Sequence, residues 1–250
     1  MQDGRFNDTI LDETSHRPWP VPSGPWIMTQ TWHDLLFAHW PVDPLVLRAL
    51  VPPSLDLDVY DGRAWVGIVP FRMSHVVPRG VPSLPWVSAF PEMNVRTYVS
   101  VGGKPGVYFF SLDATNALAV WTARTIFHLP YYRASMEIVH EEDAIAYRSH
   151  RHRSGAAFAG RYAPTSDPRP PTPGTLEYFL TERYCLYTLD GRKRTCRVDI
   201  HHPPWPLQSA AAAIAVNTMA LAAGVPLPAT PPLLHFSRRQ DMVCWKLHRV

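Results

Sequence analysis

Three polar residues at alternate positions of the segment FPEMNVRTYV are the first candidates for chemistry. Glu92, Asn94 and Arg96 project to one face of a strand, whereas Met93 and Val95 project to the other. If the polar face points into a closed sheet, a carboxylate, an amide and a guanidinium line a cavity, where burial and pairing shift their pKa values. The alternative is a solvent-exposed face with a weak Glu–Arg pair. The sequence leaves both interpretations open.

A second candidate is the stretch RTIFHLPYYR, residues 124–133, in which an amphipathic run stops at Pro130 and two adjacent tyrosines follow. A phenol can donate a proton or stabilise an oxyanion, and an arginine can hold a carboxylate. The competing interpretation is that Tyr131 and Tyr132 are ordinary core or rim aromatics.

The chain has no Walker A loop, GxGxxG, GxSxG, HExxH or CxxC motif, so the common nucleotide, hydrolase and zinc-protease classes lose their usual support. His150 and His152 share one face of a strand, but no cysteine or carboxylate joins them at ligand spacing. The basic stretch YRSHRHR around them is short and favours a solvated strand end over a phosphate contact. We therefore expect no metal and no cofactor.

Composition indicates one large, strand-rich domain. The 250 residues include 27 prolines spread over most of the chain, which disfavours long helices. A net charge of +3 predicts no nucleic-acid partner. The odd set of three cysteines fits a reducing cytoplasm. The N-terminus is polar and no apolar run reaches about 18 residues, so we expect a soluble protein that is neither exported nor membrane-bound.

Turn signals place these residues on successive hairpins. An irregular, proline-rich arm covers residues 1–25, and a single domain is expected over residues 26–250. A strand over QTWHDLLFAHWPV is followed by a short helix with Asp43 as N-cap and Pro44 at its first position. Four hairpins are then predicted, with turns at Asp61-Gly62, Gly102-Gly103, Glu141 to Asp143, and Asp190-Gly191.

Two longer helices complete the prediction. ATNALAVWTARTIFHLP has helical spacing and ends before Pro130. SAAAAIAVNTMALAAG is rich in the best helix former and ends at Gly224 as C-cap. RYAPTSDPRPPTPGTLEYF contains a proline-rich surface loop, and LLHFSRRQDMVCWKL supplies one or two final strands. About ten strands and two substantial helices indicate an α+β fold that is predominantly antiparallel.

Several strings resemble a known family. LLFAHWPVDP, DGRAWVGIVPF, FPEMNVRTYV, PGVYFFSLDA, LTERY, HHPPWPLQ and PPLLHFS are similar to the YqjF-like proteins, the DUF2071 family, from about Trp32 to Leu247. That family carries no established activity to transfer. It is grouped by fold with the acetoacetate decarboxylases, so the resemblance implies a closed or cone-like antiparallel β-sheet with a few covering helices.

The likeness to the decarboxylases can be followed along the chain. Without gaps, their glutamate falls on Glu92, their Gly-x-Tyr strand on residues 106–108, and their arginine on Arg124. ALVPPSLDLD resembles their short helix and its exit, and their early arginine falls near His33. Their lysine pair falls on Tyr131 and Tyr132. Imine chemistry requires an amine, and Lys104, at a hairpin turn, is the only lysine before Leu189, so decarboxylation through a Schiff base is not expected.

Two functions remain open, and the first is an enzyme of another kind. The hypothesis is an imine-independent lyase, isomerase or hydratase acting on a small carbonyl or carboxylate compound. Glu92 would be the acid/base, Arg124 the carboxylate anchor and Tyr131 the proton donor. Contacts to the substrate would come from Asn94, Arg96, Tyr98, His128 and Tyr132.

The second hypothesis is a non-catalytic barrel that binds or senses a small metabolite, aromatic or carboxylated, through Trp65, Tyr98, Tyr131 and Arg124. In either case the expected partner is a small-molecule ligand. A homo-oligomer stays open, because the decarboxylases assemble into large oligomers but no interface residues carry this over.

Overall fold

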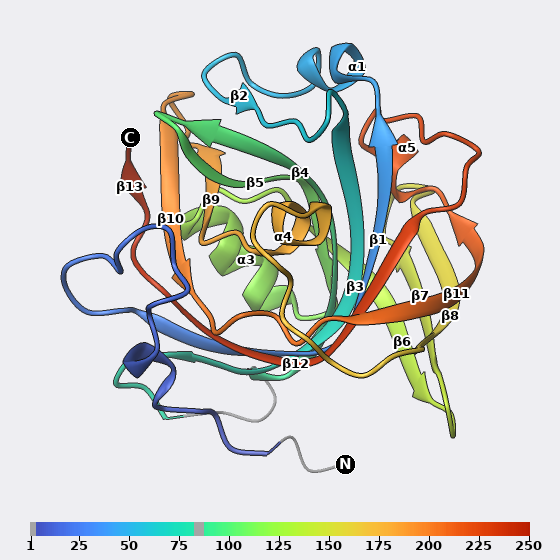
Figure 1. The fold of residues 1–250 in the computed structure, drawn as a ribbon, viewed down its shortest axis with the longest axis horizontal. Coiled ribbons are helices and arrows are strands. Elements are labelled where there is room, and N and C mark those ends of the chain that lie inside the picture. Colours follow the sequence, from blue (N-terminus) through green and yellow to red (C-terminus); the bar gives the residue numbers. More distant parts are fainter. Residues whose placement is uncertain (1–3, 83–87) are drawn as a thin grey trace.

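The computed structural model describes residues 4–82 and 88–250. Its centre is one thirteen-stranded sheet that curves strongly around helices α3 and α4 (Figure 1). The strands are β1 Met28–Val42, β2 Asp56–Leu57, β3 Ala64–Pro78, β4 Phe90–Val101, β5 Lys104–Ala114, β6 Tyr131–His140, β7 Ile145–Arg151, β8 Ala157–Pro164, β9 Cys185–Leu189, β10 Thr195–His201, β11 Gln208–Asn217, β12 Leu233–Cys244 and β13 His248–Arg249.

The helices of the described residues are short. They are η1 Ile10–Asp12, α1 Pro44–Arg48, α3 Ala117–Ile126, α4 Leu176–Thr181 and α5 Met219–Ala222. Asp43 caps α1 by accepting from the Leu45 amide, with Pro44 at the first position, as predicted. Asn116 caps α3, and this helix ends before Pro130, as predicted.

The strand order is β13-β10-β9-β5-β6-β7-β8-β11-β12-β1-β3-β4-β2. Additional pairings of β4 with β5 and of β10 with β12 curl the sheet back on itself. Pairing is antiparallel except where β5 meets β6 and β9. The predicted class, a predominantly antiparallel α+β fold with a few covering helices, is confirmed.

Three of the four predicted hairpins are observed with the expected turns: β4–β5, β6–β7 and β9–β10. In the first, Gly102 and Gly103 both have positive φ, which glycine adopts without strain. The Asp61-Gly62 turn also forms, closed by the bonds between Tyr60 and Arg63. However, β2 pairs with β4 rather than with β3, so that prediction was wrong in its pairing.

The alanine-rich segment is the main correction. It was predicted as a helix, but residues 208–217 form strand β11, which pairs with β8 and β12. Burial along β11 alternates with period two, and Ala210, Ala212 and Ile214 pack on the core. Helix propensity is a weak preference that such pairing overrides. Only α5 at its end is helical, and Gly224 follows it with φ +81°.

The N-terminal arm lies on the domain. Ile10 is buried and packs with Val243 and Trp245, and the Arg17 guanidinium donates to the carbonyl of Ile200.

The two faces of β4 contact different parts of the molecule. Met93 and Val95 are fully buried in the largest hydrophobic cluster, and the alternate residues Glu92, Asn94 and Arg96 face the space beneath α3.

Candidate functional site

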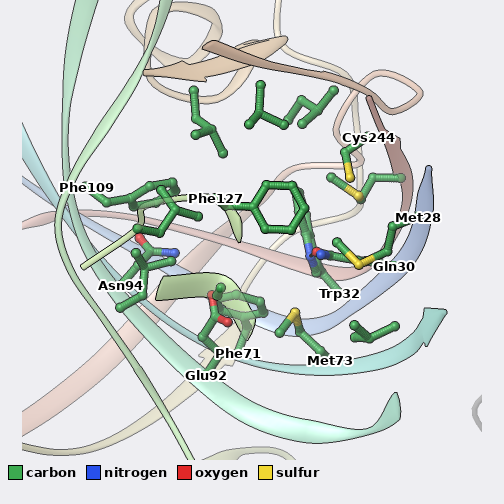
Figure 2. Close-up of a pocket in the computed structure, with 18 of the residues that line it drawn as sticks. Met28, Gln30, Trp32, Phe71, Met73, Glu92, Asn94, Phe109, Phe127 and Cys244 are labelled. Carbon is green, nitrogen blue, oxygen red and sulfur yellow. Dashed lines mark hydrogen bonds between the residues drawn. The ribbon is translucent and has the colours of Figure 1, made fainter. Parts of the chain in front are cut away.

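A cavity of about 370 Å³ lies inside the curve of the sheet, beneath α3. Figure 2 shows Glu92 and Asn94 toward one end of it, Phe127 near the middle of the view, and Met28 and Cys244 toward the other end. Its wall is mostly apolar. The apolar lining residues include Met28, Trp32, Leu35, Val69, Phe71, Met73, Val76, Phe90, Val107, Phe109, Leu112, Phe127, Leu129, Leu186, Val198, Ile200, Trp205, Met242 and Cys244.

Glu92 and Tyr131 meet in the wall of this cavity. Glu92 lies in β4 between Phe71 of β3 and Ala114 of β5, while Tyr131 is the first residue of β6 and pairs with Leu112 of β5. The Tyr131 hydroxyl donates a hydrogen bond of 2.7 Å to Oε2 of Glu92. Two residues 39 positions apart are therefore held in direct contact by the order of the strands.

Burial changes the acid–base behaviour of both groups. Glu92 is 3% exposed, and burial raises the pKa of its carboxyl to about 8. The Asp113 charge adds to that shift, while the Tyr131 hydrogen bond opposes it. Burial and the neighbouring Glu92 carboxyl raise the pKa of Tyr131 well above its usual value. At neutral pH Glu92 is therefore mainly a neutral acid whose proton can be exchanged near physiological pH.

Asn94 and Arg96 line the cavity beside Glu92. Asn94 is 5% exposed, and its side-chain oxygen has no hydrogen-bond partner in the described part of the chain. One Arg96 nitrogen, Nη2, donates to the carbonyl of Leu180 at 3.1 Å, and its buried Nε has no partner there. The polar face predicted for β4 thus points into a cavity and not to solvent.

Arg124 does not face the cavity, which corrects the expectation that it anchors a carboxylate there. The face of α3 that lines the cavity carries Leu118, Ala119, Thr122 and Ala123. Arg124, one residue further on, is turned about 100° away and is exposed. The lining contains Arg96 and Arg183 instead.

Three more expected contacts lie outside the cavity lining. His128 is exposed, and Tyr132 is 42% exposed with the Arg151 guanidinium 4.0 Å from its ring centre. Tyr98 is fully buried, and its hydroxyl donates to the carbonyl of Leu180 and contacts Nε2 of His39. Trp65 packs beside Tyr98 in a separate hydrophobic cluster.

Several residues of the wall were not predicted from the sequence. Trp205 stacks on Trp32, and its indole Nε1 is buried without a partner among the described residues. His202 and Arg183 also line the cavity. These residues lie in the strings HHPPWPLQ and LTERY, which resemble the family, and this resemblance is the one sequence feature that pointed to them.

None of the lining residues is a lysine. Lys104 lies at the start of β5 and forms an ion pair of 2.6 Å with Asp199. The Cys244 thiol reaches the cavity wall, but burial raises its pKa to about 12, so it is not a nucleophile at neutral pH. Among residues 4–82 and 88–250, no group of three or more His, Cys, Asp or Glu side chains is placed to hold a metal ion.

No helix in the described ranges has both the length and the apolar character needed to span a membrane.

The chain matches a family model over residues 29–241, that of DUF2071, described as an uncharacterized conserved protein. It is 52% identical to the uncharacterized protein YqjF of Bacillus subtilis (strain 168) over 230 residues. This alignment covers 92% of the chain and 95% of that relative. The family match therefore covers most of the chain, including most of the residues that line the cavity.

Solved structures with the same fold include acetoacetate decarboxylase from Legionella pneumophila, with a TM-score of 0.63 at 15% identity, covering 100% of the chain and 98% of that structure. The enduracididine biosynthesis enzyme MppR complexed with pyruvate has a TM-score of 0.61 at 12% identity, with coverage of 92% and 91%. An acetoacetate decarboxylase-like enzyme from Sphingomonas wittichii RW1 gives 0.61 at 13% identity, with coverage of 95% and 98%. Identities this low show the fold alone.

Proposed function

The chain belongs to the DUF2071 family and has the acetoacetate decarboxylase-like fold, and from that premise we propose that it is a small-molecule enzyme of the lyase, isomerase or hydratase type. It acts on a small carbonyl or carboxylate compound bound in the cavity, by proton transfer and without a Schiff base. Glu92 is the acid/base, and Tyr131 donates a hydrogen bond to it.

One observation carries the proposal: the 2.7 Å hydrogen bond from Tyr131 to Glu92 in the wall of an apolar cavity. A carboxyl group with a pKa of about 8 holds its proton at neutral pH and can still release it to a ligand oxygen or carbon. Once ionised, the carboxylate keeps the Tyr131 hydroxyl as a donor, which limits the cost of the buried charge. Glu92 can therefore donate a proton to a ligand and take one back, with the Tyr131 hydroxyl as its hydrogen-bond donor.

The apolar wall supports this chemistry in two ways. It excludes water from the carboxyl group, which maintains the raised pKa, and it accommodates the non-reacting part of a ligand. MppR, which shares the fold, has been solved with pyruvate, a small oxo acid. That complex supports a small oxo or carboxylate compound as the ligand class.

A binding or sensing protein is the second candidate, and the composition of the wall favours it. Burial raises the pKa of the Cys244 thiol and lowers that of the His202 imidazole, so at neutral pH neither lining group is a thiolate nucleophile or a cationic acid. A wall of this kind could retain a ligand without transforming it. Turnover separates the two candidates.

The test begins with metabolite pull-down and mass-spectrometric identification of the retained compounds. The retained compounds are then incubated with the protein in deuterium oxide. The enzyme proposal expects deuterium incorporation or conversion by the wild type, reduced roughly 10²- to 10⁴-fold in Glu92→Gln because the exchangeable carboxyl proton is lost. Glu137→Gln, an exposed glutamate in β6, is the matched control and should keep the wild-type rate. Equal rates in wild type and Glu92→Gln would reject Glu92 as acid/base, and tight binding with no conversion would favour the binding protein.

A further inference from the structure

Three buried polar groups of the cavity lining lack partners among the described residues: the Asn94 side-chain oxygen, the Arg96 Nε and the Trp205 Nε1. Buried polar atoms without a hydrogen bond are rare in folded proteins, and each one invites an explanation. These three lie in the wall of one cavity, so a ligand can satisfy them together.

The three groups are close to one another. Asn94 and Arg96 are alternate residues on the same face of β4. The Arg96 guanidinium lies 5.3 Å from the centre of the Phe37 ring, and the Trp205 ring lies 5.0 Å from the same centre, so both pack on one aromatic side chain. We call the three lining residues Asn94, Arg96 and Trp205 the head-group subsite.

The charge of this subsite is positive. Arg183, the other lining arginine, is already neutralised by Asp58 at 2.5 Å. Arg96 has no acidic partner in the described ranges; its guanidinium donates to the Leu180 carbonyl and lies against the side chains of Phe37 and Tyr98. A half-buried guanidinium without an acidic partner favours an anionic ligand, and a carboxylate fits the planar fork of donors.

The donors and the acceptor of the subsite define the ligand more closely than its charge alone. Arg96 Nε and Trp205 Nε1 can only donate, whereas the Asn94 side-chain oxygen can only accept. A carboxylate satisfies the two donors but leaves the Asn94 oxygen unpaired. A hydroxyl group close to the carboxylate supplies the missing donor, while a neutral amide would leave Arg96 without a counter-ion.

We propose that Asn94, Arg96 and Trp205 form a head-group subsite for a hydroxy monocarboxylate, with its hydroxyl one or two carbons from the carboxylate and the rest of the molecule apolar. The inference rests on the proposed function in that it names the ligand class of the same cavity. Arg96 and Trp205 hold the carboxylate, and Asn94 accepts from the hydroxyl. The chain of the ligand extends along the apolar wall toward Met28 and Cys244, past Glu92 (Figure 2).

The test is a binding titration with a matched set of probes: octanoate, 3-hydroxyoctanoate, octanamide and 1-octanol. The expected order is 3-hydroxyoctanoate, then octanoate, then the two neutral probes. The carboxylate should contribute roughly 10- to 100-fold in affinity and the hydroxyl roughly 2- to 10-fold, the ranges for hydrogen bonds to charged and neutral groups.

Two substitutions separate the contributions. Arg96→Met should abolish the preference for octanoate over 1-octanol, and Asn94→Leu should abolish only the preference for 3-hydroxyoctanoate over octanoate. If Arg96→Met unfolds, Arg96→Lys keeps the charge and should retain part of the carboxylate preference. Arg148→Met, on the exposed face of β7, is the control and should leave all four affinities unchanged.

Equal affinity for charged and neutral probes in the wild type would overturn the inference, as would a failure of all four to bind. The outcome is independent of the proposed acid/base role, because Glu92→Gln should keep the same order of probe affinities. If that variant preserves the order and yet turns over substrate at the wild-type rate, the proposed function fails and the head-group subsite stands.

Discussion

Two buried carboxylates lie on neighbouring strands, and their surroundings differ. Glu92 of β4 pairs in register with Ala114, and the next residue of β4, Met93, pairs with Asp113 of β5. Both acids are almost fully buried, at 3% and 0% exposed. Asp113 accepts two hydrogen bonds from Arg151, at 2.6 and 2.7 Å, whereas Glu92 accepts one from the Tyr131 phenol.

The partner decides what burial does to each acid. For Asp113, burial raises the pKa but the Arg151 guanidinium opposes the shift, and the pair joins β5 to β7. For Glu92, a phenol compensates much less than a guanidinium, and the pKa rises to about 8. We infer that the ion pair is a structural link and that the neutral acid, facing a cavity, is available for chemistry.

Breaking the ion pair should produce the largest effect on stability. Arg151→Met leaves the Asp113 carboxylate buried without a counter-ion, which should lower the free energy of unfolding by about 3–5 kcal/mol. Urea unfolding followed by circular dichroism measures it. Arg148→Met, whose Glu137 partner lies 3.7 Å away on the surface, should cost less than about 0.5 kcal/mol. Similar losses in the two variants would contradict a structural role specific to the buried pair.

The raised pKa of Glu92 predicts a pH dependence of stability. Its folded-state value of about 8 lies above the unfolded value near 4.5, so the folded state binds more protons between these limits. The contribution is fully present below about pH 4.5 and is lost as pH rises toward 8, by about 1.4 kcal/mol per pH unit. The wild type minus Glu92→Gln difference in unfolding free energy, measured at several pH values, isolates it. A difference that is flat over this window would mean that Glu92 is not protonated.

Removing the Tyr131 hydroxyl should raise the pKa of Glu92 further. Because the Tyr131 hydrogen bond lowers the pKa of Glu92, Tyr131→Phe should move that pKa above 8 and cost about 1 kcal/mol of stability. The same titration of unfolding free energy detects the upward shift. Tyr132→Phe, on the exposed side of the same strand, serves as the control and should leave the Glu92 titration in place. A downward shift in Tyr131→Phe would show that the bond favours the neutral acid instead.

The last prediction is the absence of an effect in a test for imine formation. The cavity lining contains no lysine, and Lys104 is paired with Asp199. Borohydride reduction in the presence of pyruvate or acetoacetate should therefore leave no adduct specific to the cavity, because no lysine amine lines it to form an imine. A stable adduct located on Lys104 would restore Schiff-base chemistry.

The fold was largely predictable because its signals are local. Asp43 before Pro44 specifies the cap of α1, and Gly102-Gly103 provides the positive φ values that the β4–β5 turn requires. The alanine-rich residues 208–217 were mispredicted because their conformation depends on β8 and β12, which lie far away in the sequence. Local propensity carries no information about such partners.

The candidate site was predictable only in part. The alternation of side chains along a strand correctly predicted that Glu92, Asn94 and Arg96 lie on one face of β4. The prediction that Arg124 faces the cavity was wrong, because a shift of one residue along a helix turns a side chain by about 100°. Trp205 lies between β10 and β11 and joins the wall by packing on Trp32 and Phe37 of β1, and no spacing in the sequence encodes that contact.

The most direct test of the central claim is the protonation state of Glu92. Infrared difference spectra of wild type and Glu92→Gln, recorded across a pH titration, isolate the carbonyl stretch of this one carboxylic acid. We expect a protonated Glu92 carboxyl at pH 7 that ionises with a pKa of about 8. A carboxylate that is already ionised at about pH 6, as an ordinary glutamate is, would contradict it.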